Sequence, residues 1–234
     1  MKLSPRLKAA ADEVHCGKKI ADIGTDHAHL PIYLVENGIC TSAVGSDLRE
    51  GPIANAKINV ANAGLSDRIQ LRLASGLDKV SPDEADDIII AGMGGILISE
   101  LIEKADWLKD KEKHLVLQPQ SHAEILRSYL IQNGYRIEKE NICEDAGRLY
   151  CVMSVYYDGE ERTYPAHYEY YGEIPACGSP LAGEYLLRLS DRYVRDAGNM
   201  RCADPQRAEE LYSIADTLNR ITSKLKGLAT AWVS

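Results

Sequence analysis

The chain has 234 residues, of which 45% are hydrophobic and 26% are charged, and its formal net charge is −8. These proportions are those of a globular protein and exclude a disordered or fibrous chain. The acidic balance works against nonspecific binding to a polyanion, so any surface for nucleic acid has to be local. The length accommodates one full α/β domain and a smaller element.

No apolar run approaches the roughly 18 residues of a membrane span, and charges interrupt the first residues, where a signal peptide needs an apolar stretch. We therefore expect a cytoplasmic protein that does not enter a membrane. The six cysteines are scattered without a Cys-x-x-Cys pair, which indicates reduced thiols and neither a disulfide framework nor a zinc knuckle. No metal site is expected.

Short apolar runs alternate with helical patterns along most of the chain. Ser4 and Pro5 are typical of the start of a first helix. Strands are then expected at residues 18–24, 42–47, 68–74, 87–92 and 114–119, and helices at 29–38, 51–64, 95–105 and 121–134, the last capped by Ser121. This alternation predicts a doubly wound α/β fold with a parallel sheet. Residues 135–142 and 148–157 predict an antiparallel hairpin at its edge.

The last third of the chain predicts a separate helical unit. Residues 159–180 are rich in Tyr, Glu, Pro and Gly without a clear period, so we expect a connection that packs by its aromatic rings. It would separate a catalytic domain, residues 1–158, from a C-terminal domain, residues 159–234. Helices are expected there at about 181–200 and 204–228, forming a coiled-coil hairpin. Its heptad seam is Leu211, Ile214, Leu218, Ile221, Leu225 and Leu228. The seam closes within one chain or between two; we favour a monomer and leave the oligomeric state open.

The segment Asp22-Ile23-Gly24-Thr25-Asp26-His27 follows the first strand, where doubly wound folds bind nucleotides. A dinucleotide fingerprint would have a second glycine where Asp26 stands, and a carboxylate there repels pyrophosphate. S-adenosylmethionine presents a sulfonium and an ammonium but no phosphate, so an acidic turn favours it. On this segment alone a simpler interpretation stays open, in which Gly24 makes a tight turn, Asp26 caps a helix and His27 is solvated.

The ends of the next strands also favour a nucleoside site. Asp47 ends the second strand, where a carboxylate accepts both ribose hydroxyls in NAD and S-adenosylmethionine sites. Residues 74–76 follow the third strand, where an adenine would lie, and the glycines of residues 91–95 follow the fourth, where they indicate that a ligand approaches the backbone. The candidate cofactor-binding residues are Asp22, Ile23, Gly24, Thr25, Asp47, Leu48, Ala74, Ser75, Gly76, Ala91, Gly92 and Gly94.

Residues 3–7, 21–34, 46–65, 91–95 and 117–120 resemble, in order and spacing, the bacterial tRNA (adenine(22)-N1)-methyltransferase family. The resemblance covers the chain to about Tyr157, and the C-terminal helices resemble the family's coiled-coil domain in pattern. It implies a Rossmann-like class I methyltransferase that uses S-adenosylmethionine to methylate N1 of adenine 22 in the D-arm region of tRNA. One departure is Ala74-Ser75-Gly76, where related sequences commonly carry an acidic residue in Gly-Asp-Gly.

This chemistry suggests roles for further residues. N1 of adenine already has a lone pair and needs positioning for in-line attack more than deprotonation. Asp26 is the first choice to stabilise the charge that methylation creates or to accept an N6 proton, and His27 could orient it, contact substrate or make only a structural hydrogen bond. The candidate catalytic residues are Asp26, His27 and Met93, and the candidate tRNA-binding residues are Arg6, Gln118, Pro119, Arg188, Arg192 and Arg195. Gln120, like Gln118, could contact a base edge, and for the arginines surface solvation is the alternative.

Other functions stay open on the sequence alone. A methyltransferase for another RNA, a small molecule or a protein fits the acidic balance but leaves the basic residues of the C-terminal helices unused. A module that holds S-adenosylmethionine or RNA without catalysis is the alternative from another class of protein. A nicotinamide-dependent oxidoreductase conflicts with Asp26.

Overall fold

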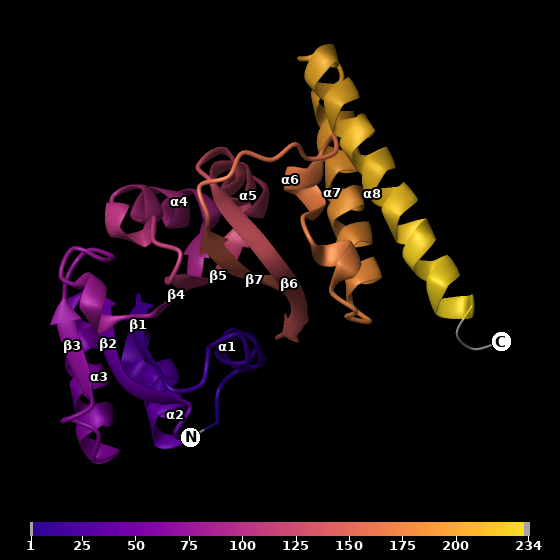
Figure 1. Cartoon of the computed structure of the whole chain (residues 1–234). Helices are drawn as coiled ribbons and strands as arrows, with labels where there is room; N and C mark the ends of the chain where they lie inside the picture. The colour runs from indigo at the N-terminus through magenta and orange to yellow at the C-terminus, as the bar shows by residue number, and fades with distance from the viewer. Residues whose placement is uncertain (1, 232–234) are drawn as a thin grey trace.

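The computed structural model describes residues 2–231, with side chains to residue 227. A seven-stranded sheet with the order β3-β2-β1-β4-β5-β7-β6 forms its centre (Figure 1). The strands are β1 (Lys18–Ile23), β2 (Cys40–Asp47), β3 (Ile69–Leu73), β4 (Asp87–Gly94), β5 (His114–Ser121), β6 (Tyr135–Asp145) and β7 (Arg148–Tyr157). The first five strands are parallel, and β7 inserts antiparallel between β5 and β6. The predicted Rossmann-like sheet with a terminal hairpin is confirmed.

The helices are α1 (Pro5–Ala11), α2 (His29–Glu36), α3 (Glu50–Asn62), α4 (Gly95–Glu103), α5 (Ala123–Gln132), α6 (Tyr168–Tyr171), α7 (Ala182–Met200) and α8 (Pro205–Ala231). Short 3-10 turns lie at η1 (Asp26–Ala28), η2 (Pro82–Glu84), η3 (Asp106–Leu108) and η4 (Ile174–Ala176). Ser4 caps α1 as predicted, since its Oγ accepts a hydrogen bond from the Leu7 amide. The prediction that Ser121 caps a helix was wrong: β5 pairs with β4 as far as Ser121, so that His122 becomes the N-cap.

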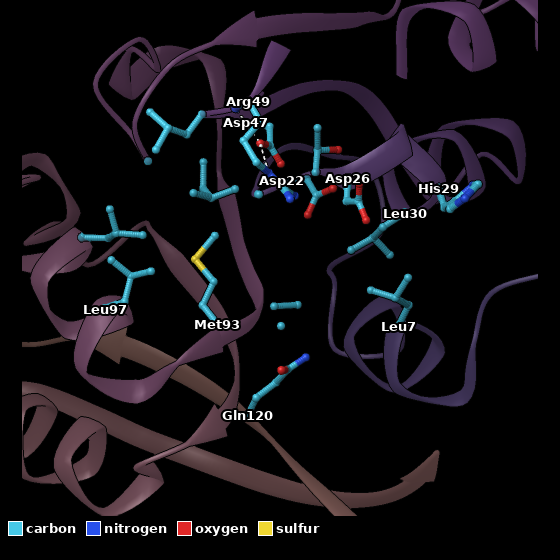
Figure 2. Close-up of a pocket in the computed structure, with 18 of the residues that line it drawn as sticks. Leu7, Asp22, Asp26, His29, Leu30, Asp47, Arg49, Met93, Leu97 and Gln120 are labelled. Carbon is cyan, nitrogen blue, oxygen red and sulfur yellow. Dashed lines mark hydrogen bonds and ion pairs between the residues drawn. The ribbon is translucent and has the colours of Figure 1, made fainter. Parts of the chain in front are cut away.

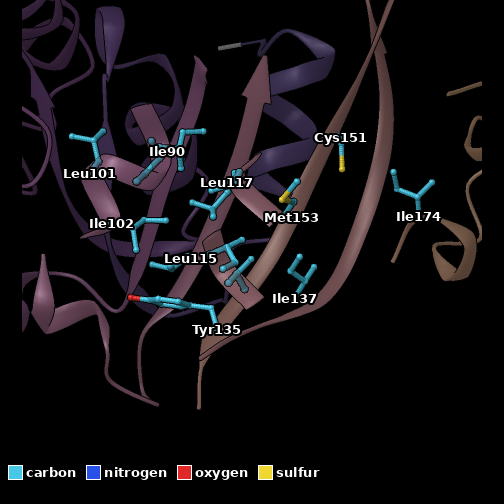
Figure 3. Close-up of a cluster of buried hydrophobic side chains, with 14 of the residues drawn as sticks. Ile90, Leu101, Ile102, Leu115, Leu117, Tyr135, Ile137, Cys151, Met153 and Ile174 are labelled. Atoms are coloured by element: carbon cyan, nitrogen blue, oxygen red, sulfur yellow. The ribbon is translucent and has the colours of Figure 1, made fainter. Parts of the chain in front are cut away.

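Two apolar clusters fix the layers, one on each face of the sheet. Helices α1, α2 and α3 cover one face and pack against Ile89 of β4. Helices α4 and α5 cover the other, against Ile90 of β4 and Leu115 and Leu117 of β5 (Figure 3). Because neighbouring residues of a strand point to opposite faces, the apolar run of β4 is buried on both sides, as the sequence pattern indicates. The buried strands thus hold their carboxyl ends in fixed positions.

The two C-terminal helices lie side by side next to β6 (Figure 1). Ser190 Oγ of α7 donates to the Ala215 carbonyl of α8 at 3.1 Å, and Leu186 and Leu218 belong to the same apolar cluster as β4 and β5. Leu211, Ile214 and Leu218 of the predicted seam are buried and Ile221 and Leu225 pack at its margin, whereas the side chain of Leu228 lies outside the described ones. The seam closes against α7 of the same chain.

The connection before these helices contains the short helix α6 and the turn η4 and packs through aromatic rings, as expected. Tyr164 stacks on Tyr168 with centroids 4.3 Å apart, and Tyr170 meets Tyr193 of α7 edge-on. The apolar core continues across this region, so the boundary between residues 158 and 159 stays a prediction. Within residues 2–231, no helix has both the length and the hydropathy that crossing a membrane requires.

Candidate active site

A cavity of about 500 Å³ opens at the carboxyl ends of the parallel strands (Figure 2). Its walls come from the ends of β1, β2, β4 and β5 and from the turns that follow β1, β2 and β3, with α1 and α4 on either side. The predicted site residues that line it are Arg6, Asp22, Ile23, Gly24, Thr25, Asp26, Asp47, Leu48, Ser75, Gly76, Ala91, Gly92 and Met93. Doubly wound sheets bind ligands at this edge. The fold therefore brings together residues that lie up to 114 positions apart in the sequence, from Arg6 to Gln120.

Backbone hydrogen bonds hold the strand-end turns to one another. The Gly24 and Thr25 amides both donate to the Ser46 carbonyl, at 2.8 and 2.9 Å, and Ser46 Oγ donates to the Gly76 carbonyl at 2.8 Å. The Ala74 amide donates to the Asp47 carbonyl at 3.0 Å. These bonds satisfy the amides inside the protein, so the turns after β1 and β3 are fixed relative to β2 before any ligand binds.

Two glycines permit close approaches in this cavity. Gly24 has a φ of +77° and its missing Cβ leaves room for Met93 Cε. Gly92 has a φ of +84°, and a Cβ there would stand 3.0 Å from Arg6 Nη1. A side chain at either position would be strained by the backbone and would displace Met93 or Arg6. Met93, next to Gly92 at the end of β4, thus packs against Gly24 in the turn after β1.

Three carboxylates, Asp22, Asp26 and Asp47, line the cavity together with two arginines, Arg6 and Arg49. Asp22 is 5% exposed, and its burial, together with the nearby Asp47 charge, raises its pKa to about 6. Asp47 is also buried, and its Oδ1 accepts the Arg49 amide at 2.9 Å and lies 3.5 Å from Arg49 Nε. Asp26 is exposed at the wall of the cavity. A cavity of this size and charge fits a nucleoside ligand with cationic groups and no phosphate.

The two glutamines at the end of β5 have different environments. Gln118 is fully buried, and its Oε1 accepts hydrogen bonds from Arg6 Nη1 at 2.7 Å and from the Gly92 amide at 3.1 Å. Its Nε2 donates to the Pro119 carbonyl. Gln118 thus lies beneath the cavity instead of on its wall, because its amide is used to hold Arg6 and the β4 turn. Gln120 lines the cavity (Figure 2).

The structure places His29, and not the predicted His27, on the cavity wall. His27 has a φ of 61° and is absent from the cavity wall, whereas His29 lines it. The two rings stack with centroids 5.5 Å apart, and His27 Nε2 lies 3.6 Å from Asp26 Oδ1. His27 therefore lies close to the Asp26 carboxylate but outside the cavity wall. Two predicted cofactor-binding residues, Ala74 and Gly94, do not line the cavity. The lining residues that the sequence did not indicate are Leu7, His29, Leu30, Arg49, Leu97 and Leu101.

A second cavity of about 320 Å³ adjoins the first at Gln120, which lines both. It lies between the end of β5, the start of α5, β7 and α7. It is lined by Pro119, Gln120, Arg148, Tyr150, Arg188 and Arg192 among others. The Arg6 guanidinium lies 5.8 Å from the Tyr150 ring centroid, and so connects the two cavities. Arg195 lines neither of them.

The Rossmann-like sheet, the glycine turn and the acidic nucleoside cavity together define the class of S-adenosylmethionine-dependent methyltransferases. Comparison with known proteins agrees, because the family described as "Methyltransferase domain" matches residues 3–153. The tRNA (adenine(22)-N(1))-methyltransferase of Bacillus subtilis is 34% identical over 98% of this chain and 93% of its own length. The chain belongs to the tRNA (adenine(22)-N1)-methyltransferase family.

Solved structures show the same arrangement over the whole chain. The B. subtilis m1A22 tRNA methyltransferase TrmK superposes with a TM-score of 0.82 at 28% identity, covering 96% of this chain and 98% of that one. Streptococcus pneumoniae Sp1610 in complex with S-adenosyl-L-methionine gives a TM-score of 0.78 at 32% identity, covering 93% and 98%. The C-terminal helices are therefore part of the shared architecture.

Proposed function

We propose that this protein transfers the methyl group of S-adenosylmethionine to N1 of adenine 22 in the D-arm region of tRNA. The cavity at the carboxyl edge of the sheet carries the proposal. The negative charges of Asp22, Asp26 and Asp47 attract a nucleoside with cationic groups and repel a cofactor that bears phosphates. The family relationship supplies the substrate, tRNA, and the position of the base.

The residues around the cavity fit S-adenosylmethionine, which supplies an electrophilic methyl group on its sulfonium. Asp47 is suited to accept the ribose hydroxyls through Oδ2, because both of its contacts with Arg49 use Oδ1. Asp22 faces the cationic portion of the ligand. Ser75 and Gly76 border the adenine, where the Ser75 hydroxyl replaces the acidic side chain common in related sequences.

The target base enters the same cavity from the side of Gln120. Its N1 attacks with a lone pair, so the protein has to align it and to stabilise the positive charge that the product carries. Asp26 is placed for that role or for accepting an N6 proton, with His27 behind it. Met93, against Gly24, borders both donor and acceptor. Gln120 can hydrogen-bond the base edge, while Gln118 positions Arg6 near the cavity mouth.

The second cavity supports the body of the tRNA. Arg148, Arg188 and Arg192 surround it with positive charge on an otherwise acidic protein, and Tyr150 offers a ring for stacking. Arg195, further along α7, is placed to contact the phosphate backbone of the tRNA. Because the substrate is tRNA, we place the protein in the cytoplasm, and because the helical seam closes within the chain, we propose a monomer.

The test is methyl transfer from radiolabelled S-adenosylmethionine to an unmodified tRNA transcript with adenine at position 22. The matched control is the same transcript with guanine at position 22. Label in the adenine transcript alone, recovered as 1-methyladenosine after digestion, is the expected result.

Two other outcomes would contradict the proposal. Label in both transcripts would move the reaction to another RNA site. Label in neither, although S-adenosylmethionine binds, would favour a small-molecule or protein substrate or a non-catalytic module.

A further inference from the structure

A cluster of metal-ligand side chains lies at the edge of the sheet opposite the cofactor cavity. Asp87 begins β4, His114 begins β5 directly beside it, and His15 lies in the segment between α1 and β1. The three side chains each offer one ligand atom, and these atoms lie within 4.8 Å of one another. We propose that His15, Asp87 and His114 bind a divalent transition-metal ion, with Zn²⁺ as the best match.

The distances suit a four-coordinate ion. His15 Nδ1 lies 3.1 Å from Asp87 Oδ2, and His114 Nδ1 lies 3.3 Å from the same oxygen. Ligands about 2.0–2.1 Å from Zn²⁺ in a tetrahedron stand about 3.3 Å from one another. Both histidine–carboxylate distances thus match those around a shared ion, and all three ligand atoms lie within 4.8 Å of one another. Two imidazoles and one carboxylate form a donor set that Zn²⁺ accepts readily.

The buried His114 nitrogen is the independent observation that points to a ligand. His114 is 2% exposed, and within the described part of the chain its Nδ1 makes no hydrogen bond of good geometry, although Asp87 Oδ2 lies 3.3 Å away. Its Nε2 is paired with Ser154 Oγ at 2.8 Å. A nitrogen that is buried, unsatisfied and directed toward a carboxylate loses free energy unless a proton or a cation occupies the space between them.

The surrounding residues resemble those that orient metal-binding histidines. Each histidine turns one nitrogen toward Asp87 and pairs the other with a hydroxyl, His114 with Ser154 and His15 with Tyr156 at 3.1 Å. Such partners fix the ring and its tautomer in metal sites. Asp87 in turn accepts the His15 backbone amide at 2.7 Å. The His15 side chain is 46% exposed, so an ion and a coordinating water have a route from solvent.

A metal ion bound at this site would affect the cofactor cavity, at the opposite edge of the sheet, through the position of α1. His15 follows α1, and α1 carries Arg6 and Leu7 to the cofactor cavity. An ion between His15 and the ends of β4 and β5 would hold α1 against the sheet. The proposed ion is therefore structural and separate from the methyl-transfer chemistry.

The experiment measures Zn²⁺ binding to tag-free protein that has been dialysed first against a chelator and then against metal-free buffer. Competition with a chromophoric chelator should give one Zn²⁺ per chain. His15→Asn and Asp87→Asn should each weaken the affinity by at least about tenfold. His122→Asn is the matched control and should bind Zn²⁺ as the unchanged protein does. His122 is exposed and pairs with Glu124, and among the described residues this pair has no third potential ligand.

Co²⁺ provides a second measurement. The unchanged protein should show the intense visible absorption of four-coordinate Co²⁺, and His15→Asn should not. Retained S-adenosylmethionine binding shows that each variant is folded. No stoichiometric Zn²⁺ binding, or binding that His15→Asn and Asp87→Asn leave unchanged, would overturn the proposal without touching the proposed methyl transfer.

Discussion

The Asp22 carboxylate is buried beneath the cofactor cavity, although burial disfavours its charged form. Its pKa is about 6 in the folded protein against an ordinary value of 3.8, so the folded state holds a proton that the unfolded state has released between these pH values. The contribution of Asp22 to the free energy of unfolding is therefore fully present below about pH 4 and is lost as the pH rises through about 6. At neutral pH the buried charge destabilises the free protein and favours a cationic ligand.

We predict that Asp22→Asn stabilises the cofactor-free protein at pH 7 by about 1–3 kcal/mol, since two pKa units correspond to about 3 kcal/mol. The same change should weaken binding of S-adenosylmethionine at least about tenfold, because an attraction to the cationic ligand is lost. Urea denaturation and calorimetric titration measure the two effects. Asp26→Asn, at an exposed carboxylate, is the control and should leave stability within about 0.5 kcal/mol.

The pH dependence of cofactor binding follows from the same group. Only ionised Asp22 attracts the cation, so the Kd for S-adenosylmethionine should rise as the pH falls from about 7 to about 5, by at most about tenfold per unit. Titrations across this range test the prediction. The slope should disappear in Asp22→Asn; a slope that persists in that variant would assign the titration to a different residue.

Gln118 and Gln120 should separate positioning from substrate contact. Gln118→Leu leaves Arg6 and the Gly92 amide without their acceptor, so it should destabilise the protein by about 1–3 kcal/mol and lower kcat. Gln120→Leu should leave stability unchanged and raise KM for tRNA. Denaturation curves and steady-state kinetics distinguish the two, and equal losses of stability in both variants would contradict the assignment.

Residue types and strand ends identify most of the cavity from the sequence alone, because parallel strands bring their carboxyl ends together. The remaining errors are of orientation. His27 and Ala28 both have a positive φ, and His29, not His27, lines the cavity. In an ideal strand Gln118 and Gln120 would share a face, but the pairing of β5 with β4 is irregular around Pro119, and Gln118 is buried while Gln120 lines the cavity. No periodicity encodes such choices. The Asp87–His114 pair likewise depends on strand register, which joins residues distant in the chain.

At the scale of elements, the buried pair Arg127–Glu140 joins α5 and β6 to the connection that follows β7. Arg127 Nε and Nη2 donate to Glu140 Oε1 at 3.0 and 2.9 Å, and both side chains are almost fully buried. Arg127 Nη1 donates to the Glu169 carbonyl, and Glu140 Oε2 accepts the Glu173 amide. The pair thereby fixes α6 and its flanking residues against the sheet.

We predict that Arg127→Met destabilises the protein by about 3–5 kcal/mol, because Glu140 would remain as an unpaired buried charge. Adding Glu140→Gln should recover part of that loss, since the charge disappears while an acceptor for Glu173 remains. Chemical denaturation of the single and double variants measures both steps. A double variant that is less stable than Arg127→Met would show that Glu140 finds other partners.

The elements themselves were predictable where hydrophobic pattern and turn chemistry agree. The wholly apolar run of β4 and the hairpin around residues 144–147 are examples, since burial on both faces and a short turn leave few alternatives. The short helix α6 was not predicted. Its residues, Tyr168–Tyr171, have no helical period, and tertiary contacts with α5 and with Tyr193 of α7 hold them in place. Tertiary packing decides such short segments more than propensity does.

At the scale of the whole molecule, an acidic protein has to bind a polyanion. We propose that the second cavity provides a local solution, since two arginines of α7 and Arg148 of β7 line it beside Gln120, while three carboxylates line the cofactor cavity. On this proposal the two adjoining cavities attract different ligands. Leu186 and Tyr193 of α7 pack in the same apolar core as β4 and β5, which places the second cavity beside the first.

We predict that Arg148→Ala and Arg188→Ala each raise KM for tRNA several-fold and leave kcat and S-adenosylmethionine binding unchanged, because both side chains are exposed and line the second cavity but not the cofactor cavity. Each lost phosphate contact should lower the slope of log affinity against log salt by about 1. Arg136→Ala, at an exposed arginine of β6 that pairs with Glu138, is the control. Equal salt slopes in all three variants would place the tRNA on another face, whereas a smaller slope in Arg148→Ala and Arg188→Ala alone would fix its path from α7 across Gln120 to the base.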